Sequence, residues 1–401
     1  MVNPDIRLSL DGKILRGVNN KKILSINIPN SVTTIGHGAF EGCSELQHVD
    51  IPNSVTTIKY SAFRDCTSIQ SIEIPNTIVS IEDAAFFGCT SLKFIDIPNS
   101  VKTIGNAAFA LCTALESIIL PNSVIAIGSG IFHSCSALRN IALPKSIASI
   151  GEGAFYRCIS LQTVEFQCSV ASITSEMFYC CENLQSFVIP DSVISIGYQS
   201  FFGCKSLSSI VIPNSVSLIG VEAFEGCSAL KSVSISKFVK SISKEVFKEC
   251  SSLEHVILPN SLISIEEGAF MCCTALKSID IPDSVDSIND RAFQECTALQ
   301  TIVIPNSVKT IGHGTFAECK SLQSVYIPDS VFIIGEDAFY GCNSLSKVHC
   351  NIKNPIDSNR VYLDSSFNCL YDNAVLFVPS GSRSEFRHHK TFQKFKHIEA
   401  M

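Results

Sequence analysis

The sequence predicts a repeat protein of the α/β type, in which one short unit recurs along a single solenoid. Three observations predict this fold class. Phenylalanine recurs every 23 residues from Phe40 to Phe339, at fourteen positions without a slip. A cysteine stands three residues after each of these phenylalanines, and a leucine stands six residues after each, with Ile69 as the one exception. Self-similarity with a fixed period of about 20 to 50 residues is typical of solenoids, whose units stack along one axis.

Each unit is expected to contain a strand, a turn, a second short strand and a helical turn. In the unit that begins at Leu46, apolar and polar residues alternate and β-branched side chains are common, which predicts a strand up to Ile51. The Pro-Asn-Ser triplet at residues 52–54 ends this strand, because proline cannot donate a hydrogen bond to a sheet. A second extended piece follows. The segment SAFRDC around Phe63 is then predicted to be one helical turn that points alanine, phenylalanine and cysteine inward.

The repeat divides the chain into three expected parts. Residues 24–350 are expected to form a solenoid of about fourteen units, with an N-terminal cap at residues 1–23 and a C-terminal cap at residues 351–401. A 23-residue unit is too small to bury a core of its own, so its stability has to come from its neighbours. The first and last units would expose an apolar face, and the caps are needed to cover it.

The composition excludes several classes of partner. The net charge of −7 and the isoelectric point of about 5.7 argue against binding to nucleic acid or to an anionic membrane surface. The sequence has no run of eighteen apolar residues, which argues against membrane insertion. The first eighteen residues lack the apolar core of a signal peptide, although a chain whose leader had been removed would look the same.

The repeat positions carry no pattern that is typical of catalysis. There is no C-x-x-C motif for zinc, and the GHG triplets at 36–38 and 312–314 lack the lysine of a phosphate-binding loop. Adjacent carboxylates such as Glu266 and Glu267 have no histidine or nucleophile at matching positions. We therefore expect no enzyme, no catalytic residue, no metal site and no cofactor. A hydrolase within residues 351–401 ranks behind this expectation, since about fifty residues form a cap more readily than an enzyme.

The nineteen cysteines allow two interpretations. Fourteen of them share one repeat position, so their side chains would stack in parallel at a separation too large for the usual disulfide geometry. We therefore favour buried free thiols that act as small apolar side chains over a ladder of disulfides. The five cysteines outside this position are the candidates for reaction or cross-linking: Cys168, Cys180, Cys272, Cys350 and Cys369.

The unit resembles the leucine-rich repeat of the BspA-like family. The string LQHVDIPNSVTTIKYSAFRDCTSI at residues 46–69 matches the pattern L-x-x-I-x-I-P-x-S-V-x-x-I-G-x-x-A-F-x-x-C-x-x-L, and the resemblance covers about residues 24–350. The tail at residues 376–400 is similar to the C-terminal segment of many bacterial members. The resemblance implies a right-handed leucine-rich-repeat solenoid, with a parallel β-sheet on one face and short strands and helical turns on the other. It also implies adhesion or protein binding at the cell surface or outside the cell, while a cytoplasmic location stays open.

The outward positions of the predicted strands form the candidate binding surface. The residue ten places after each repeat phenylalanine is expected to face outward, and β-branched residues dominate this row from Ile119 onward. An exposed apolar stripe of this kind would bind a protein or peptide, such as a host or bacterial surface macromolecule. The candidates in the row are Ile119, Val188, Val211, Ile257, Val303 and Tyr326. Phe238, in a unit that departs from the repeat pattern, is a further candidate contact.

Another interpretation of the same row stays open. Sheet propensity alone also favours β-branched residues, with no partner involved. In that case the chain would be a purely structural spacer or scaffold that positions something attached to it. The sequence therefore predicts a non-catalytic protein-binding or adhesion module, with an architectural element as the alternative.

Overall fold

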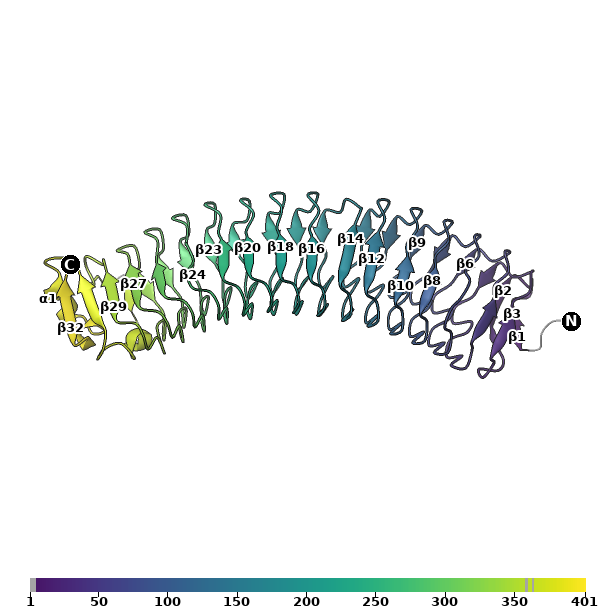
Figure 1. The fold of residues 1–401 in the computed structure, drawn as a ribbon, viewed down its shortest axis with the longest axis horizontal. Helices are drawn as coiled ribbons and strands as arrows, with labels where there is room; N and C mark the ends of the chain where they lie inside the picture. The colour runs from purple at the N-terminus through teal and green to yellow at the C-terminus, as the bar shows by residue number, and fades with distance from the viewer. Residues whose placement is uncertain (1–4, 358–359, 363) are drawn as a thin grey trace. The chain divides into compact units, whose positions relative to one another are not determined.

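The computed structural model describes residues 5–357, 360–362 and 364–401. The chain forms two compact units, one made of Met1–Val193 with Ser200–Lys205 and the other of Ile194–Gln199 with Ser206–Met401. Each unit is a parallel β-solenoid. Paired strands in both units align residues that are 23 positions apart, such as Thr34 with Thr57 and Ser287 with Thr310. Figure 1 shows the coils of each unit following one another in chain order.

One coil of the first unit shows the local rules. In the strand β5 (His48–Asp50) the middle residue, Val49, is buried and both neighbours are exposed. Pro52 follows, and its carbonyl accepts a hydrogen bond of 3.0 Å from the backbone N–H of Val55, which closes the turn. The second strand, β6 (Thr57–Ile58), then begins. The predicted order of strand, proline turn and second strand is confirmed.

The first unit holds two rows of strands. The row of two-residue strands, preceded by the antiparallel hairpin β1–β2, forms one eight-stranded sheet in the order β1-β2-β4-β6-β7-β9-β11-β13. The other row includes the parallel pairs β3–β5, β8–β10 and β12–β14. The remaining bounds are β1 (Ile6–Leu8), β2 (Ile14–Val18), β3 (Ser25–Asn27), β4 (Thr34–Ile35), β7 (Ser80–Ile81), β8 (Phe94–Asp96), β9 (Thr103–Ile104), β10 (Ser117–Ile119), β11 (Ala126–Ile127), β12 (Asn140–Leu143), β13 (Ser149–Ile150), β14 (Thr163–Phe166), β15 (Ser172–Ile173) and β16 (Ser186–Val188).

The second unit repeats this arrangement. Its two-residue strands include a six-stranded sheet, β21-β23-β24-β26-β28-β30, and its longer strands include a five-stranded sheet, β25-β27-β29-β31-β32. The bounds are β17 (Ser195–Ile196), β18 (Ser209–Val211), β19 (Leu218–Ile219), β20 (Ser232–Ser234), β21 (Ser241–Ile242), β22 (His255–Ile257), β23 (Ser264–Ile265), β24 (Ser287–Ile288), β25 (Thr301–Val303), β26 (Thr310–Ile311), β27 (Ser324–Ile327), β28 (Ile333–Ile334), β29 (Lys347–Cys350), β30 (Val361–Tyr362), β31 (Val375–Val378) and β32 (His397–Ala400).

The repeat phenylalanines form the core of each unit. They are fully buried, and rings one repeat apart are stacked. In the first unit Phe40 and Phe63 have ring centroids 5.0 Å apart with an interplanar angle of 12°. In the second unit Phe293 and Phe316 are 5.6 Å apart at 4°. Side chains at equivalent repeat positions therefore lie on top of one another within a unit, as expected for stacked coils.

The segments centred on these phenylalanines are not helical, so this part of the predicted α/β class is wrong. The residues two before and two after each repeat phenylalanine have positive φ, as do Ser61 at 54° and Asp65 at 57°. An α-helix requires right-handed dihedral angles at every residue, so such a segment cannot continue as one. Instead, the N–H of Phe63 donates to the carbonyl of Ala85 in the next coil at 2.7 Å, while the N–H of Arg64 closes a turn onto Ser61.

The nineteen cysteines are all free thiols, and sixteen of them are buried, which confirms the favoured interpretation. The thiols at the repeat position also make a hydrogen bond. Cys112 Sγ, for example, donates to the carbonyl of Phe86 in the preceding coil at 3.2 Å. Burial raises the pKa of Cys112 to about 12, so the thiol stays protonated and able to donate.

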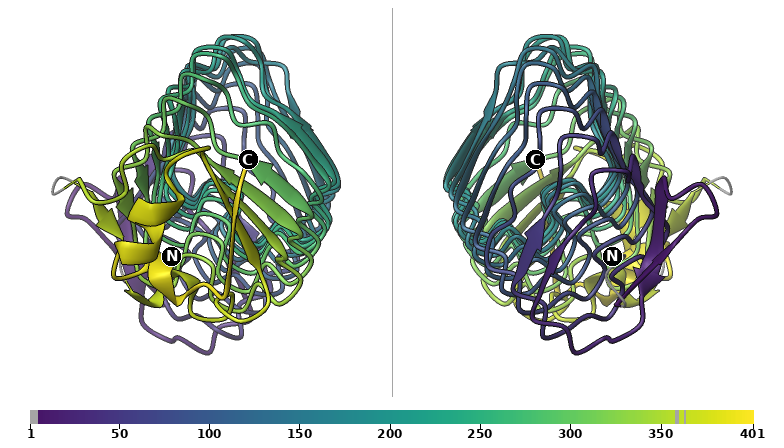
Figure 2. Two further views of the ribbon diagram at one scale, coloured as in Figure 1. Left: turned by 90° about the vertical axis from the view of Figure 1, so that its left-hand side faces the viewer. Right: turned by 90° about the vertical axis from the view of Figure 1, so that its right-hand side faces the viewer.

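The C-terminal segment covers the end of the phenylalanine stack in the second unit. It contains η1 (Asp364–Phe367), the six-residue helix α1 (Arg383–His388) and η2 (Phe392–Lys394). Phe367 stacks on Phe339 at 5.4 Å, and Phe392 and Phe395 lie 5.8 and 5.6 Å from Phe367. Figure 2 shows α1 in yellow beside the last coils, and β1 and β2 in purple at the start of the first unit. Among the described residues, no helix has the length and hydropathy needed to cross a membrane.

Candidate partner-binding face

The candidate row lies on the outward side of the longer strands, as predicted. In β25 the middle residue, Ile302, is buried, whereas Val303 beside it is 62% exposed. Strand alternation explains this placement, because successive side chains point to opposite sides of a strand. The other members are exposed as well: Ile119, Val188, Val211, Ile257 and Tyr326.

An aromatic ladder occupies the C-terminal part of this row in the second unit. Val303 pairs with Tyr326 across β25–β27, Tyr326 with His349 across β27–β29, and His349 with Phe377 across β29–β31. The three rings are stacked, with centroids 4.4 Å apart for Tyr326 and His349 and 4.8 Å apart for His349 and Phe377. Burial, and secondarily the charge of Lys347, lower the pKa of His349. The imidazole is therefore neutral at neutral pH.

The rest of the row in the second unit is interrupted. Asp280 stands between Ile257 and Val303, and its segment, residues 278–280, is not part of a strand. Ser234 pairs directly with Ile257 across β20–β22. The structure therefore does not join the second-unit candidates into one apolar stripe. It brings Val303 and Tyr326 together and leaves Ile257 apart from them.

The two candidates of the first unit lie on its own longer strands. Ile119 is 72% exposed and pairs with Asp96 across β8–β10. Val188 is 80% exposed at the end of β16. The acidic side chain of Asp96 lies opposite Ile119, so Ile119 does not continue an apolar stripe toward the preceding coil. Single exposed apolar residues of this kind are common on protein surfaces.

Phe238 does not belong to the row. It lies in the turn between β20 and β21, where it is 52% exposed. The Nζ atom of Lys237 is 5.2 Å from the centroid of its ring. The backbone N–H of Phe238 donates to Ser236 Oγ at 3.3 Å, so a serine in place of the usual proline helps to order this turn.

His349 and Phe377 are site residues that were not predicted from the sequence. His349 stands at the expected repeat position, but it is not apolar. Phe377 pairs with a residue 28 positions earlier instead of 23, so counting in repeats does not reach it. The string LFVP at residues 376–379 has the apolar-x-apolar-proline form of the repeat strands, and this is the pattern that could have located it.

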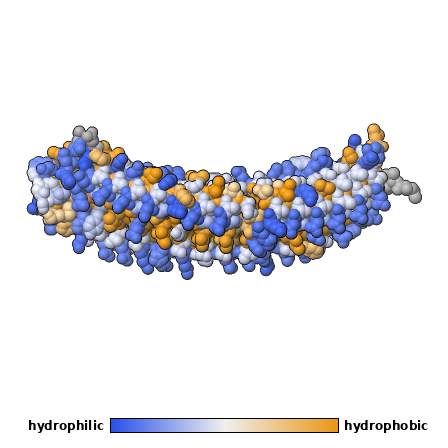
Figure 3. Space-filling model, turned by 90° about the horizontal axis from the view of Figure 1, so that it is seen from above, coloured by the Kyte–Doolittle hydropathy of each residue, from blue (hydrophilic) through white to orange (hydrophobic). Residues whose placement is uncertain are grey.

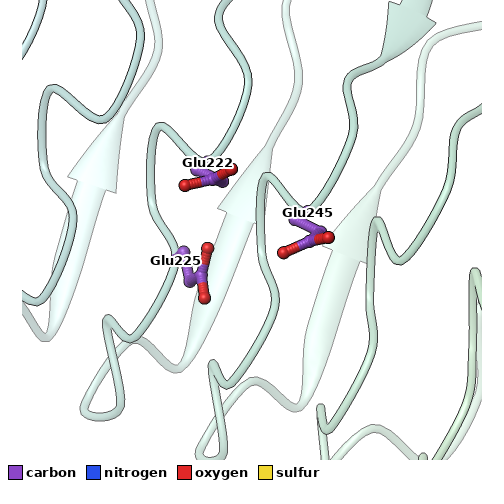
Figure 4. A group of neighbouring side chains, drawn as sticks. All are labelled: Glu222, Glu225 and Glu245. Carbon is purple, nitrogen blue, oxygen red and sulfur yellow. The ribbon is translucent and has the colours of Figure 1, made fainter.

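A cluster of carboxylates lies elsewhere on the second unit, on the Phe-centred segments. Glu222 and Glu225 come from one coil and Glu245 from the next, as Figure 4 shows, with ligand atoms within 4.8 Å of one another. Lys248 Nζ contacts Glu225 at 2.9 Å and Glu245 at 2.8 Å. Burial raises the pKa of Glu225, while its hydrogen bond to Lys248 opposes this change. The cluster is thus an ion-pair network that stabilises adjacent coils.

Apolar side chains are widespread on the outer surface of both units. Figure 3 shows apolar patches, in orange, among polar residues along the face in view. Exposed apolar side chains also occur on the two-residue strands or next to them, such as Leu218 and Ile263. The aromatic ladder differs from these because three of its side chains are rings stacked across adjacent strands.

The comparisons with known proteins agree with this architecture. The family model described as "BspA type Leucine rich repeat region (6 copies)" matches residues 18–138, 102–231, 171–300 and 219–346. Among the curated proteins, no match to this chain was found. A leucine-rich repeat protein from Bacteroides ovatus is similar to this chain, with 29% identity, a TM-score of 0.69 and coverage of 87% of this chain and 94% of that one.

A second solved structure is also similar, a leucine rich cell surface protein from Faecalibacterium prausnitzii. It is 27% identical, with a TM-score of 0.51 and coverage of 87% of this chain and 93% of that one. The matching family model spans most of the sequence, and the repeat phenylalanines, cysteines and proline turns occupy the places that the family pattern requires. The chain therefore belongs to the BspA-type leucine-rich-repeat family.

Proposed function

We propose that this chain is a non-catalytic protein-binding module, and that its second unit binds a protein or peptide on the outward face of β25, β27, β29 and β31. The observation that carries the proposal is the contact ladder Val303, Tyr326, His349 and Phe377 on four adjacent strands. A contiguous apolar and aromatic patch with a polar rim is typical of an interaction surface. Leucine-rich repeats are commonly used for protein binding, which supports the same conclusion.

The chemistry of the ladder suits a protein partner. Tyrosine and other aromatic side chains contribute strongly to interface energetics, because they bury a large area and can still form hydrogen bonds. The rings of Tyr326, His349 and Phe377 are already stacked, so little side-chain freedom remains to be lost on binding. The adjacent outward positions Thr301 and Lys347 supply a polar rim.

The wider proposal includes the remaining predicted contacts and a location. Ile257 and Val211 would make separate contacts on the second unit, and Phe238 would add a contact at a turn. Ile119 and Val188 would contribute on the first unit. We place the protein at the cell surface or outside the cell, with a role in adhesion. The family and the similarity to a bacterial cell surface protein support this placement.

A pair of matched variants of the full chain tests the proposal. Val303→Asp/Tyr326→Asp places two charges in the ladder, and Ile263→Asp/Ile333→Asp places two charges on exposed apolar residues of the same unit outside it. Each immobilised protein is used to capture proteins from bacterial and host surface extracts. Captured proteins are then purified, and their affinities for the wild type, the ladder variant and the control variant are measured. We expect a partner whose affinity falls at least tenfold for the ladder variant and less than twofold for the control.

A spacer would behave differently. If no protein is captured, or if every captured protein binds the ladder variant and the wild type equally well, the ladder is not a binding surface. The architectural alternative would then stand. Far-UV circular dichroism of both variants checks that the aspartates leave the coils intact.

A further inference from the structure

A small pocket lies on the Phe-centred segments of the second unit. Its volume is about 260 Å³, and its lining residues lie on consecutive coils between Met271 and Tyr340. The residues of the aromatic ladder stand on the longer strands and do not line this pocket. The pocket is therefore a separate feature of the surface, with a chemistry of its own.

The pocket is open because one coil has almost no side chains at this place. Each Phe-centred segment has two positions that usually carry surface side chains, two places before and one place after the phenylalanine. Around Phe316 these residues are Gly314 and Ala317, the smallest pair at these positions in the fourteen segments. The N–H of Ala317 donates to the carbonyl of Gly314 at 3.0 Å, and the N–H of Gly314 donates to the carbonyl of Glu336 in the next coil at 2.8 Å. The floor of the pocket is thus hydrogen-bonded backbone and one methyl group.

The two neighbouring coils form the walls of the pocket. Arg291 and Gln294 occupy the same two positions in the preceding coil. Asp337 and Tyr340 occupy them in the following coil, and Tyr340 is 52% exposed. A Cβ atom built on Gly314 would lie 3.7 Å from Cγ of Arg291, so the stem of this arginine borders the floor. Among the described residues, Arg291 and Asp337 form no ion pair, so both charged groups are available to a ligand.

We propose that this pocket binds one uncharged sugar ring, such as a hexose residue of a glycan. The lining carries one positive and one negative charge, from Arg291 and Asp337, so it gives no net attraction to an anion or a cation. Both groups form strong hydrogen bonds with neutral hydroxyl groups, because one partner is charged. The volume lies just below the range of about 300–1,000 Å³ for sites that hold larger small molecules, which suits a single six-membered ring.

Each wall has a role in this complex. A pyranose ring has one face of C–H groups, and these pack against the negative face of an aromatic ring, here that of Tyr340. Its hydroxyl groups both donate and accept hydrogen bonds. The carboxylate of Asp337 accepts from them, while the guanidinium of Arg291 and the amide of Gln294 donate to them.

The test uses the full chain, with the methyl glycosides of glucose, galactose and mannose as probes and saturation-transfer NMR as the measurement. Ala317→Tyr fills the pocket. The coils accommodate tyrosine at this repeat position, since Tyr156 and Tyr179 occupy it in the first unit with ring centroids 4.5 Å apart. Ala110→Tyr is the matched control, because it makes the same substitution at the same repeat position of the first unit. Tyr340→Ala removes the aromatic wall, and far-UV circular dichroism checks the fold of each variant.

We expect at least one glycoside to bind the wild type and Ala110→Tyr with affinities within twofold of each other. Ala317→Tyr and Tyr340→Ala should bind it at least fivefold more weakly. Asp337→Asn should weaken binding severalfold, because an amide oxygen accepts a weaker hydrogen bond than a carboxylate. Asparagine tolerates the positive φ of 53° at this residue, so the coil should stay intact.

Three results would each overturn the proposal. The first is that no glycoside binds the wild type. The second is that Ala317→Tyr binds as well as Ala110→Tyr, and the third is that N-acetylarginine amide binds more tightly than every glycoside. None of these outcomes depends on the aromatic ladder, so the proposed protein-binding function is tested separately.

Discussion

At the scale of single residues, the glycine four places before the repeat phenylalanine shows how closely consecutive coils approach. A Cβ atom built on Gly128 would lie 2.4 Å from the backbone N of Asn106 in the preceding coil, and one on Gly105 would lie 2.4 Å from the N of Asp83. Contacts of this length between a Cβ and a backbone atom require the backbone to move. Glycine is present at these coils because the preceding chain occupies the space of a side chain.

Gly128→Ala should therefore destabilise the protein by about 3 kcal/mol, the upper part of the range for overpacking. Urea unfolding of the full chain, followed by circular dichroism, measures the change. Gly130→Ala is the matched control, because its Cβ meets nothing nearer than 3.7 Å and its cost is limited to the positive φ of 59°, about 1 kcal/mol. A smaller loss at Gly128 than at Gly130 would contradict the close approach of the coils.

The positions of these glycines can be read from the sequence, but the reason why glycine is required there cannot. Their position after the second strand suggests a chain reversal, whereas the structure shows contact with the preceding coil. The thiol of Cys112 is a similar case, since its burial follows from the repeat but its bond to Phe86 depends on the neighbouring coil. Both features depend on contacts between residues more than twenty positions apart, which local patterns do not contain.

At the scale of elements, the strands and proline turns were predictable from the sequence. The conformation of the Phe-centred segments, which were expected to be helical turns, was not. Alternation and proline act within a few residues, so β5 and β6 could be located from sequence. In the Phe-centred segments every second N–H bonds to the next coil, and the residues two before and two after the phenylalanine have positive φ. Residues such as Arg157 and Glu249, at φ of 56° and 61°, have no strong preference for this conformation. Stacking of the coils imposes it.

If coils are interchangeable within a unit, removing one whole repeat should be tolerated. Deletion of residues 87–109 places Phe132 directly on Phe86 and should leave cooperative urea unfolding and far-UV circular dichroism close to those of the wild type. Deletion of residues 87–98 keeps Phe109 in the chain but shifts it out of the 23-residue register, so that it can no longer stack on Phe86. The free energy of unfolding should then fall by about 3–5 kcal/mol, as for loss of a large core side chain. Equal stability of the two deletion variants would show that the 23-residue register is not what holds the unit together.

At the scale of the whole molecule, repetition of one short strand pattern gives each unit a row of outward-facing side chains. The outward row was predictable because strands alternate, and the exposed positions of Val211 and Val303 agree with this. The places where this row is interrupted or changes its spacing were not predictable. Asp280 interrupts it, and Phe377 joins it through a register of 28 residues. The same spacing of 28 residues places Phe367 on Phe339 in the core stack, so the last coil does not follow the 23-residue period.

Function at this scale depends on which outer surface meets a partner. The aromatic ladder is the candidate in the second unit, because its stacked rings are in contact across adjacent strands. Charged substitutions in the ladder test this role experimentally.

Within each unit, equivalent residues of successive repeats lie on top of one another and face the same side. Thiol counting with an aromatic disulfide reagent at pH 8 tests this stacking, because fourteen cysteines share one inward position. Burial raises the pKa of Cys112 and that of Cys158 to about 12, so these thiols should stay protonated and unreactive. Without reductant, the native chain should show at most three reactive thiols, the half-buried Cys180, Cys272 and Cys369, and the chain in denaturant all nineteen. More than three fast thiols in the native protein, or fewer than nineteen in denaturant, would show that the repeat cysteines are not stacked inward as free thiols.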